Sequence, residues 1–336
     1  MPSWDECGTG AAAVGDRRIA RNGATFRVAR HRARLRGMET YPTASEVVRG
    51  HDLTGVNVIV TGGTSGLGAE TARVLAAAGA RVVAAGRSWG SAESPATVEF
   101  EELDLASLAS VDAFVRRWNR PLHVLVNNAG VMRTPFGRTA EGFELQFGTN
   151  HLGHFALAIG LLPALRDAGE ARVVALSSRG HRRSDINFED PNYLSRPCDP
   201  WEAYGQSKTA NCLFAVGLTR RGMPANAVAP GSIQTRLMRH MPREELAARG
   251  WLDSAGNRVD GQGPGWKTVE QGAATTVWAA IAPQLQGVGG KYLDNCAIAE
   301  PWTGQGDVPF GCYAPYALDP DRAERLWTLS EKLIAR

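Results

Sequence analysis

A tyrosine and a lysine four residues apart are the residue types in this sequence that could transfer protons. They lie in the stretch AYGQSKTANC as Tyr204 and Lys208, and this lysine is one of only four in a chain with 33 arginines. Residues four apart share one face of a helix, so the phenol and the ammonium are predicted to lie side by side. A nearby ammonium should lower the pKa of the tyrosine from its usual value near 10. The spacing therefore indicates a proton-transfer centre, with an incidental pair on a solvated helix as the alternative.

A glycine-rich segment could bind a pyrophosphate. A buried-strand pattern at 56–62 runs into TGGTSGLG, residues 61–68, and a helical pattern follows at 69–80. Glycine lets the backbone approach a ligand closely, and the start of a helix attracts anions. The spacing is Gly-x-x-x-Gly-x-Gly, and no Gly-Lys-Ser/Thr follows, so ATP is disfavoured. We expect a dinucleotide loop, with a purely structural turn as the alternative.

The residue after the second predicted strand indicates which dinucleotide binds. NAD is usually recognised here by a carboxylate that binds the ribose 2′-OH. This chain has Gly86-Arg87-Ser88 instead. A guanidinium suits a 2′-phosphate, so NADP is favoured over NAD. A solvated loop arginine is the alternative.

Short apolar runs alternate with helical patterns, which is typical of βαβ crossovers and a parallel sheet. The segment 143–169 is long enough for one extended helix, and another continues beyond Lys208. We predict an α/β fold with a doubly wound parallel sheet of Rossmann type in a single domain at 45–336, after an extension at 1–44. The predicted strands lie at 56–62, 81–86, 98–104, 123–128, 172–178, 225–231 and 291–295.

Charge and cysteine content exclude several classes of protein. The net charge is +3, but residues 1–37 carry a net +5, so the rest is near neutral and no nucleic-acid surface is expected. The five cysteines have no metal-ligand spacing, so neither a metal site nor a disulfide framework is expected, and a cytoplasmic location fits best. The sequence contains no run of 18 apolar residues, so no membrane span is predicted. The Arg-rich start should lie outside the core, and the true start could be Met38.

Four landmarks occur in order: TGGTSGLG, NNAG at 127–130, SS at 177–178 and YGQSK at 204–208. Together they resemble the short-chain dehydrogenase/reductase family, over about residues 45 to 335. FGTNHLGHF and the long gap between Ser178 and Tyr204 resemble its retinol-dehydrogenase-like branch. The resemblance implies an NADP(H)-dependent enzyme that interconverts a carbonyl and an alcohol. It implies a catalytic tetrad of Asn150, Ser178, Tyr204 and Lys208.

The expected cofactor site combines the glycine loop, Arg87 and positions implied by the resemblance. One departure is Ser232, where relatives usually carry a bulkier residue after Pro-Gly. The predicted cofactor-binding residues are Gly62, Thr64, Ser65, Gly66, Leu67, Gly68, Arg87, Asp104, Asn128, Ala129, Gly130, Tyr204, Lys208, Pro230, Gly231 and Thr235.

The other tetrad positions have their own chemical logic. Ser178 lies just past a buried strand, where its hydroxyl could hold a substrate oxygen, whereas alternation would point Ser177 the other way. Asn150 has poor helix propensity, which indicates a helix distortion that holds a water beside Lys208. His151 and His154 could imitate a metal pair, but no third ligand is evident.

Three segments, 183–202, 232–266 and 297–318, are expected to cover the active site. Their aromatic residues predict a roomy pocket for an apolar or polycyclic small molecule, with simple loop packing as the alternative. A non-catalytic NADP-binding regulator and a redox-neutral lyase or epimerase are the rival functions. Whether the chain forms homo-oligomers through the helices that carry Asn150 and Tyr204 stays open. The aromatic residues are Trp201, Trp251, Trp266, Trp302, Phe310, Tyr313 and Tyr316.

Overall fold

The computed structural model describes residues 41–89, 97–248, 251–253, 255–257 and 266–335. Thr40–Arg336 group into one compact unit. Its first helix is α1 (Ala44–Val48), whose N-cap Thr43 and Glu46 form a reciprocal capping box. The first 40 residues of the predicted extension, including the candidate start at Met38, lie outside the described residues.

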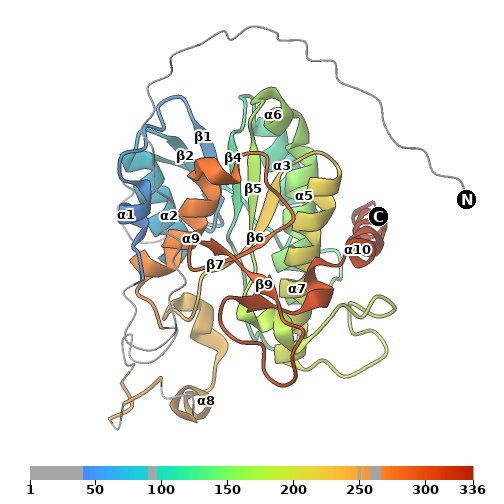
Figure 1. Ribbon diagram of the computed structural model, residues 1–336. Helices are drawn as coiled ribbons and strands as arrows, with labels where there is room; N and C mark the ends of the chain where they lie inside the picture. The colour runs from blue at the N-terminus through green and yellow to red at the C-terminus, as the bar shows by residue number, and fades with distance from the viewer. Residues whose placement is uncertain (1–40, 90–96, 249–250, 254, 258–265, 336) are drawn as a thin grey trace, which may run out of the picture. The chain divides into compact units, whose positions relative to one another are not determined.

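A central sheet organises the described chain, as Figure 1 shows. Its strand order is β3-β2-β1-β4-β5-β6-β7-β8, and all neighbours are parallel except β7 and β8. This confirms the predicted doubly wound α/β fold. The strands are β1 (Asn57–Thr61), β2 (Arg81–Gly86), β3 (Val98–Glu102), β4 (Val124–Asn127), β5 (Arg172–Leu176), β6 (Ala225–Ala229), β7 (Tyr292–Asp294) and β8 (Ala297–Ile298).

Helices cover both faces of the sheet because its strands are apolar on both sides. Val58 and Val60 face one layer, and Ile59 between them faces the other. The first layer holds α1, α2 (Gly66–Ala77) and α9 (Val269–Ile281). The opposite layer holds α3 (Leu108–Arg117), α5 (Gly153–Gly160) and α7 (Pro200–Arg220).

The strand order reverses between β1 and β4, and ligands of such folds bind at the carboxyl edge beside this point. The seven predicted strands are all present, and six of them end earlier than the sequence predicted. Gly62, Ser178 and Gly231 therefore stand in the loops at this edge instead of inside strands.

The predicted single helix at 143–169 is wrong. It is divided into α4 (Leu145–Phe147), the π-helical turn η1 (Gly148–Leu152), α5 and α6 (Leu162–Asp167). The amide of Gly153 bonds to the carbonyl of Gly148, five residues back, which inserts an extra residue into the turn around Asn150. Pro163 has no amide hydrogen to continue the helical pattern into α6.

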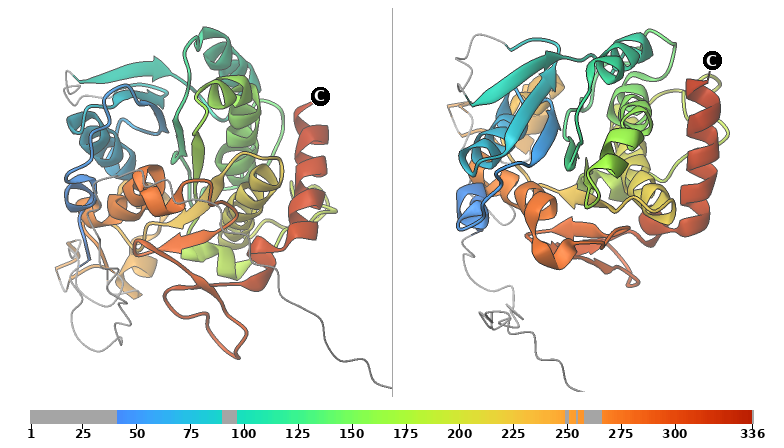
Figure 2. Two further views of the ribbon diagram at one scale, coloured as in Figure 1. Left: turned by 45° about the horizontal axis from the view of Figure 1, so that its top comes forward. Right: turned by 90° about the horizontal axis from the view of Figure 1, so that it is seen from above.

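The last helix, α10 (Pro320–Ile334), packs along the outer side of α7 (Figure 2). No described helix is both long and apolar enough to cross a bilayer. The remaining elements are α8 (Arg243–Ala248), β9 (Glu300–Pro301), β10 (Cys312–Tyr313) and the short helices η2 (Arg179–Arg183), η3 (Arg236–His240), η4 (Pro283–Leu285) and η5 (Pro315–Leu318).

Candidate active site

A cleft of about 1380 Å³ opens at the carboxyl edge of the sheet. All sixteen residues that the sequence predicted to bind the cofactor line it, and Ser178 joins Tyr204 and Lys208 there. Asn150 does not line the cleft but lies behind it, fully buried in η1. The fold thus brings together residues spread over more than half of the chain.

The loop between β1 and α2 can only be built with glycine at key positions. Gly62 and Gly66 have positive φ angles of 64° and 54°. A Cβ on Gly68 would lie 2.3 Å from the carbonyl oxygen of Gly62. The side chain of Ser65 does not cap α2, so it leaves the first amides of the helix to other partners. This cradle suits an anion at a helix start.

Thr61, which the sequence analysis did not single out, attaches the NNAG segment to this loop. Its hydroxyl accepts hydrogen bonds from the amides of Asn128 and Ala129, both at 2.9 Å. The Asn128 side chain donates to the carbonyl oxygen of Thr61 at 2.7 Å. The segment after β4 is therefore held against the end of β1.

The distortion predicted at Asn150 is present as η1. Its amide group is fully used by protein partners: Oδ1 accepts from the amide of Val131 at 2.8 Å, and Nδ2 donates to the carbonyl of Val131 and to Ser207 Oγ, both at 2.9 Å. Gly130 packs here without a side chain, because a Cβ would lie 3.0 Å from Asn150 Oδ1 and 3.6 Å from Lys208 Nζ. Asn150 therefore connects the NNAG segment to α7.

Tyr204 and Lys208 lie on one face of α7, which begins at Pro200 after the N-cap Asp199. The ammonium is 5.7 Å from the centre of the tyrosine ring, and it donates to the carbonyl of Leu176 at 3.0 Å. Burial raises the pKa of Tyr204 to about 12, and a hydrogen bond with Ser178 opposes this rise. Burial lowers the pKa of Lys208 to about 8.

In the protein without a bound cofactor, the pKa of Tyr204 is therefore raised and not lowered as the sequence predicted. Loss of hydration disfavours the phenolate, and this effect outweighs the opposing hydrogen bond with Ser178. The same burial lowers the pKa of Lys208 and so reduces the stability of the ammonium that was expected to favour the phenolate.

The two adjacent serines have different environments. Ser178 lines the cleft, and its Oγ accepts from the amide of Gly180 at 3.0 Å. Ser177 also borders the cleft, but it is buried and its hydroxyl donates to the carbonyl of Lys208 at 2.8 Å. Because the Ser177 hydroxyl is engaged by the Lys208 carbonyl, Ser178 is the residue that a substrate oxygen could reach.

The two histidines near Asn150 do not form a metal pair. His151 contacts Ser330 of α10, whereas His154 contacts Thr61 of β1. Among the described residues, no group of three or more potential ligands could hold a metal ion.

Two arginines line the cleft close enough for their charges to act on each other. Arg87, after β2, and Arg239, in η3, both line it. Burial lowers the pKa of Arg239, and the positive charge of Arg87 lowers it further. The sequence analysis missed Arg239 because 152 positions separate it from Arg87 and no local motif marks it.

Apolar side chains surround Tyr204 in the same cleft. Met132 and Met238 pack in one cluster with Tyr204, and Trp201 meets the tyrosine ring edge-on with centroids 6.1 Å apart. Trp251 also lines the cleft and contacts Trp266 at 5.0 Å. Of the aromatic residues expected at the pocket, Trp201 and Trp251 line the cleft, whereas Trp266 does not.

Other predicted pocket aromatics pack on the body instead. Tyr313 and Tyr316 adjoin the hydrophobic core, and the Tyr316 hydroxyl donates to the carbonyl of His181 at 2.7 Å. Trp302 and Phe310 do not line the cleft either.

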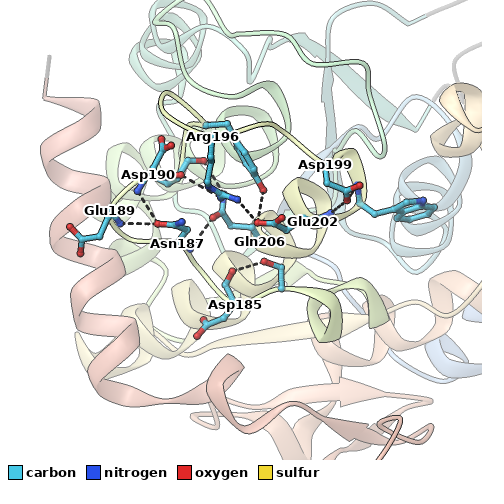
Figure 3. A network of polar contacts seen from close by, with 12 residues as sticks. Asp185, Asn187, Glu189, Asp190, Arg196, Asp199, Glu202 and Gln206 are labelled. Atoms are coloured by element: carbon cyan, nitrogen blue, oxygen red, sulfur yellow. Dashed lines mark hydrogen bonds and ion pairs between the residues drawn. The ribbon is translucent and has the colours of Figure 1, made fainter.

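The segment 183–202 was expected to cover the site, but only Arg183 and Trp201 of it line the cleft. The rest is fixed beside α7 by the polar network in Figure 3. Gln206 of α7 accepts from the amide of Asn187 and donates to the carbonyl of Pro191, both at 2.9 Å. The segment is therefore part of the scaffold.

A C-terminal segment contributes one wall of the cleft through Gly306, Asp307 and Val308, which we call the flap. Arg182 holds the flap by donating to the carbonyls of Val308, Pro309 and Cys312. The neighbouring Arg179 lies 3.6 Å from the centre of the Phe310 ring. Two arginines that closely follow Ser178 thus anchor this wall.

A glycine loop at the switch point of a doubly wound sheet, in one cleft with Ser178 and the buried Tyr204 and Lys208, defines a dinucleotide-binding oxidoreductase. The short chain dehydrogenase family model matches residues 56–246, and the chain belongs to this family. The retinol-dehydrogenase-like branch stays a prediction.

Individual relatives agree with this assignment. A probable oxidoreductase of Streptomyces lividans is 50% identical over 289 residues, covering 82% of this chain and 96% of that protein. A probable oxidoreductase of Streptomyces antibioticus is also 50% identical, over 290 residues, with the same shares covered. A crystal structure of a putative uncharacterized protein from Mycobacterium paratuberculosis is 36% identical with a TM-score of 0.65, covering 88% of this chain and 98% of that one.

Proposed function

We propose that this oxidoreductase uses NADP(H) to interconvert a carbonyl and an alcohol on an apolar, small organic molecule. The observation that carries the proposal is the convergence of Ser178, Tyr204 and Lys208 in the cleft that also holds the glycine loop. A proton donor, an oxygen-binding hydroxyl and a cation are thus gathered where the family binds its nicotinamide cofactor.

The residues present fit an NADP(H) molecule. The Gly62–Gly68 cradle has no room for a Cβ at Gly68, which suits close backbone approach by a pyrophosphate. Arg87 and Arg239 place two guanidiniums at the cofactor end of the cleft, where a 2′-phosphate would be recognised. When bound, NADPH supplies the hydride.

The chain's own groups account for the proton at the substrate oxygen. With a pKa of about 12, Tyr204 stays protonated at neutral pH and can donate its phenolic proton to that oxygen. Ser178 can donate a second hydrogen bond to the same oxygen. Lys208, with a pKa of about 8, remains mostly charged at neutral pH and stabilises the phenolate that is left behind.

The surroundings of Tyr204 support an apolar substrate. Met132, Met238 and Trp201 form an adaptable apolar surface on the side of the phenol that faces the cleft. Trp251 extends this surface along the cleft. A flat, lipophilic or polycyclic carbonyl compound would bury the largest area here.

The cysteines support a reducing, cytoplasmic location. Cys198, Cys212, Cys296 and Cys312 are all free thiols in the described part of the chain. Disulfides persist mainly in oxidising compartments, so unpaired cysteines fit the cytoplasm.

A panel of carbonyls and alcohols with NADPH and NADP⁺ tests the proposal on wild type and on Tyr204→Phe. We expect the variant to bind NADPH but to lose turnover by about 10²–10⁴-fold. Tyr193→Phe is a matched control, because Tyr193 lies outside the cleft and its hydroxyl contacts Glu202. Equal turnover in wild type and Tyr204→Phe would remove Tyr204 from the mechanism.

The same panel separates the rival functions. Binding of NADPH with no turnover of any compound would favour a regulatory protein. Consumption of substrate without net change in nicotinamide absorbance would favour a lyase or epimerase.

A further inference from the structure

We propose that His154 is a positioning residue that joins the cofactor loop to Asn150 and, through it, to the catalytic helix α7. The proposal rests on the proposed function for its kinetic consequences, but its structural content is independent of the substrate. The histidine does not line the cleft, so it acts through the residues it holds.

His154 lies in α5 and is almost completely buried, with 1% of its surface exposed. Its Nδ1 is 2.9 Å from the carbonyl oxygen of Asn150, and its Nε2 is 2.8 Å from Thr61 Oγ1. Both ring nitrogens therefore have close partners, one in the π-helical turn and one at the end of β1.

The partners determine which nitrogen carries the proton. The Asn150 carbonyl can only accept, so Nδ1 must donate to it. Burial keeps the imidazole neutral by lowering its pKa to about 4, so Nε2 has no hydrogen and must accept. The Thr61 hydroxyl supplies that hydrogen, while its lone pairs accept from the amides of Asn128 and Ala129.

The alternative acceptor for the Thr61 hydroxyl is less favourable. The carbonyl of Val126 lies 3.3 Å away, compared with 2.8 Å for His154 Nε2. The shorter contact is the better hydrogen bond, so the threonine proton is assigned to the histidine.

The chain of hydrogen bonds continues from Asn150 to α7. Asn150 Nδ2 donates to Ser207 Oγ at 2.9 Å, and the Ser207 hydroxyl donates to the backbone carbonyl of Tyr204 at 2.8 Å. Thr61, His154, Asn150, Ser207 and the Tyr204 backbone thus form one buried series. Because every member is buried, removing one donor leaves an unsatisfied polar group that water cannot reach.

This series links the two halves of the site that must be in register. Thr61 directly precedes Gly62 of the cofactor loop, and Tyr204 is the proposed proton donor. The carbonyl of Asn150 is also oriented by its hydrogen bond with His154 Nδ1. Small shifts along the series would therefore displace the phenol relative to the cofactor.

His151 provides a matched contrast three residues away. Ser330 Oγ donates to the carbonyl of Leu326, so it accepts from His151, whose hydrogen must be on Nε2. His151 Nδ1 has no hydrogen-bond partner, and the ring packs against Phe147, Phe155 and Phe214. This histidine joins α10 to the body and has no path to the cofactor loop.

The tautomers can be tested on the wild-type protein without any substrate. Histidine-selective ¹³C and ¹⁵N labelling followed by NMR at pH 7 distinguishes the two neutral tautomers and the cation. We expect the Nδ1–H form for His154 and the Nε2–H form for His151, with His154→Gln and His151→Gln used for assignment. An Nε2–H or cationic His154 would overturn the proposal.

Paired substitutions test the positioning role. In His154→Asn the side-chain amide can still donate from near the Nδ1 position, whereas His154→Gln reaches toward Thr61 and loses that donor. His154→Asn thus loses the contact with Thr61 and His154→Gln loses the contact with Asn150, so we expect kcat to fall about 10- to 100-fold in both variants. The Kd for NADPH should rise by less than the fall in kcat.

His151→Gln should lower the melting temperature with kcat unchanged. The proposal is overturned if His154→Gln or His154→Asn does the same. Should the wild type reduce no carbonyl, the proposed function fails, but the NMR result still decides whether the hydrogen-bond series exists.

Discussion

The ammonium of Lys208 lies 5.7 Å from the centre of the Tyr204 ring, and both side chains are buried one helical turn apart. Room for a cation here is small, because Nζ contacts the carbonyl of Leu176 and would be 3.6 Å from a Cβ at Gly130. A compact ammonium fits this space better than a broad guanidinium. This gives a physical reason for one lysine in a chain whose positive charges are nearly all arginine.

The rate of carbonyl reduction should fall as the pH rises through about 8. Burial lowers the pKa of Lys208 to about 8, so its positive charge is lost above this pH, whereas Tyr204 stays protonated until about 12. Profiles of kcat/KM from pH 6 to 10 measure this fall in rate. In Lys208→Arg the value of kcat/KM should be lower at every pH, but its fall above about pH 8 should disappear, because a guanidinium keeps its charge. An unchanged fall in that variant would assign it to another group.

Cofactor preference should depend on Arg87 and Arg239 together. Each guanidinium is expected to bind the 2′-phosphate, so Arg87→Gln or Arg239→Gln should raise the KM for NADPH about tenfold and leave that for NADH nearly unchanged. Arg87→Asp should shift preference toward NAD. Arg81→Gln is the matched control, since Arg81 begins β2, does not line the cleft and pairs with Glu99. An unchanged NADPH/NADH ratio in Arg87→Gln would exclude its role.

Acid should destabilise the protein through its buried histidines. Burial lowers the pKa values of His151, His154 and His181 to about 3, 4 and 4 from the ordinary 6.5. Between pH 4 and pH 6.5 the histidines bind more protons in the unfolded chain than in the folded protein. The free energy of unfolding therefore falls as the pH drops from 6.5 toward 4. Denaturant titrations at several pH values check this, and His151→Gln should show a shallower decline. Equal slopes in the two proteins would contradict the assignment.

Substrate affinity should depend on the anchor between Arg182 and the flap. Arg182→Ala removes donors to three carbonyls, so we expect the KM of a bulky substrate to rise about tenfold, with less effect on a small ketone. NADPH affinity should not change. Arg182→Lys keeps the charge but not the planar fork, so it should behave almost like Arg182→Ala. Full recovery in Arg182→Lys would show that charge alone matters.

The outer side of α7 should not form a subunit interface. Trp327 of α10 packs against Phe155 and Phe214, and Glu324 pairs with Arg221 at the end of α7. Light scattering after size exclusion should therefore give no dimer through this face, and Trp327→Ala should cost about 3–5 kcal/mol of stability. A dimer cross-linked through α7 would contradict this prediction.

Local pattern was enough to predict the sheet, the glycine loop and the Tyr204/Lys208 spacing. It also favoured Ser178 over Ser177, although both serines follow the end of β5 at Leu176. What it could not predict depends on contacts between distant segments. The role of Thr61 requires β1 and β4 to be neighbours, and its contact with His154 joins residues 93 positions apart.

The pKa of Tyr204 shows the same limit. The sequence places a cation one turn away but does not reveal how deeply both groups are buried, and burial decides the direction of the shift. The role of Arg182 likewise has no local signal in the sequence, because its partner in the flap, Val308, lies more than 120 positions later.

The position of α10 also bears on how the enzyme matures during synthesis. The ribosome releases α7 about one hundred residues before the helix that covers its apolar flank. Until Trp327 emerges, Phe214 lacks one of its aromatic partners, although Phe155 and His151 already contact it, so a nascent chain would expose part of this apolar surface. Chaperones that recognise exposed aromatic surface would therefore meet this chain late in translation, and at α7.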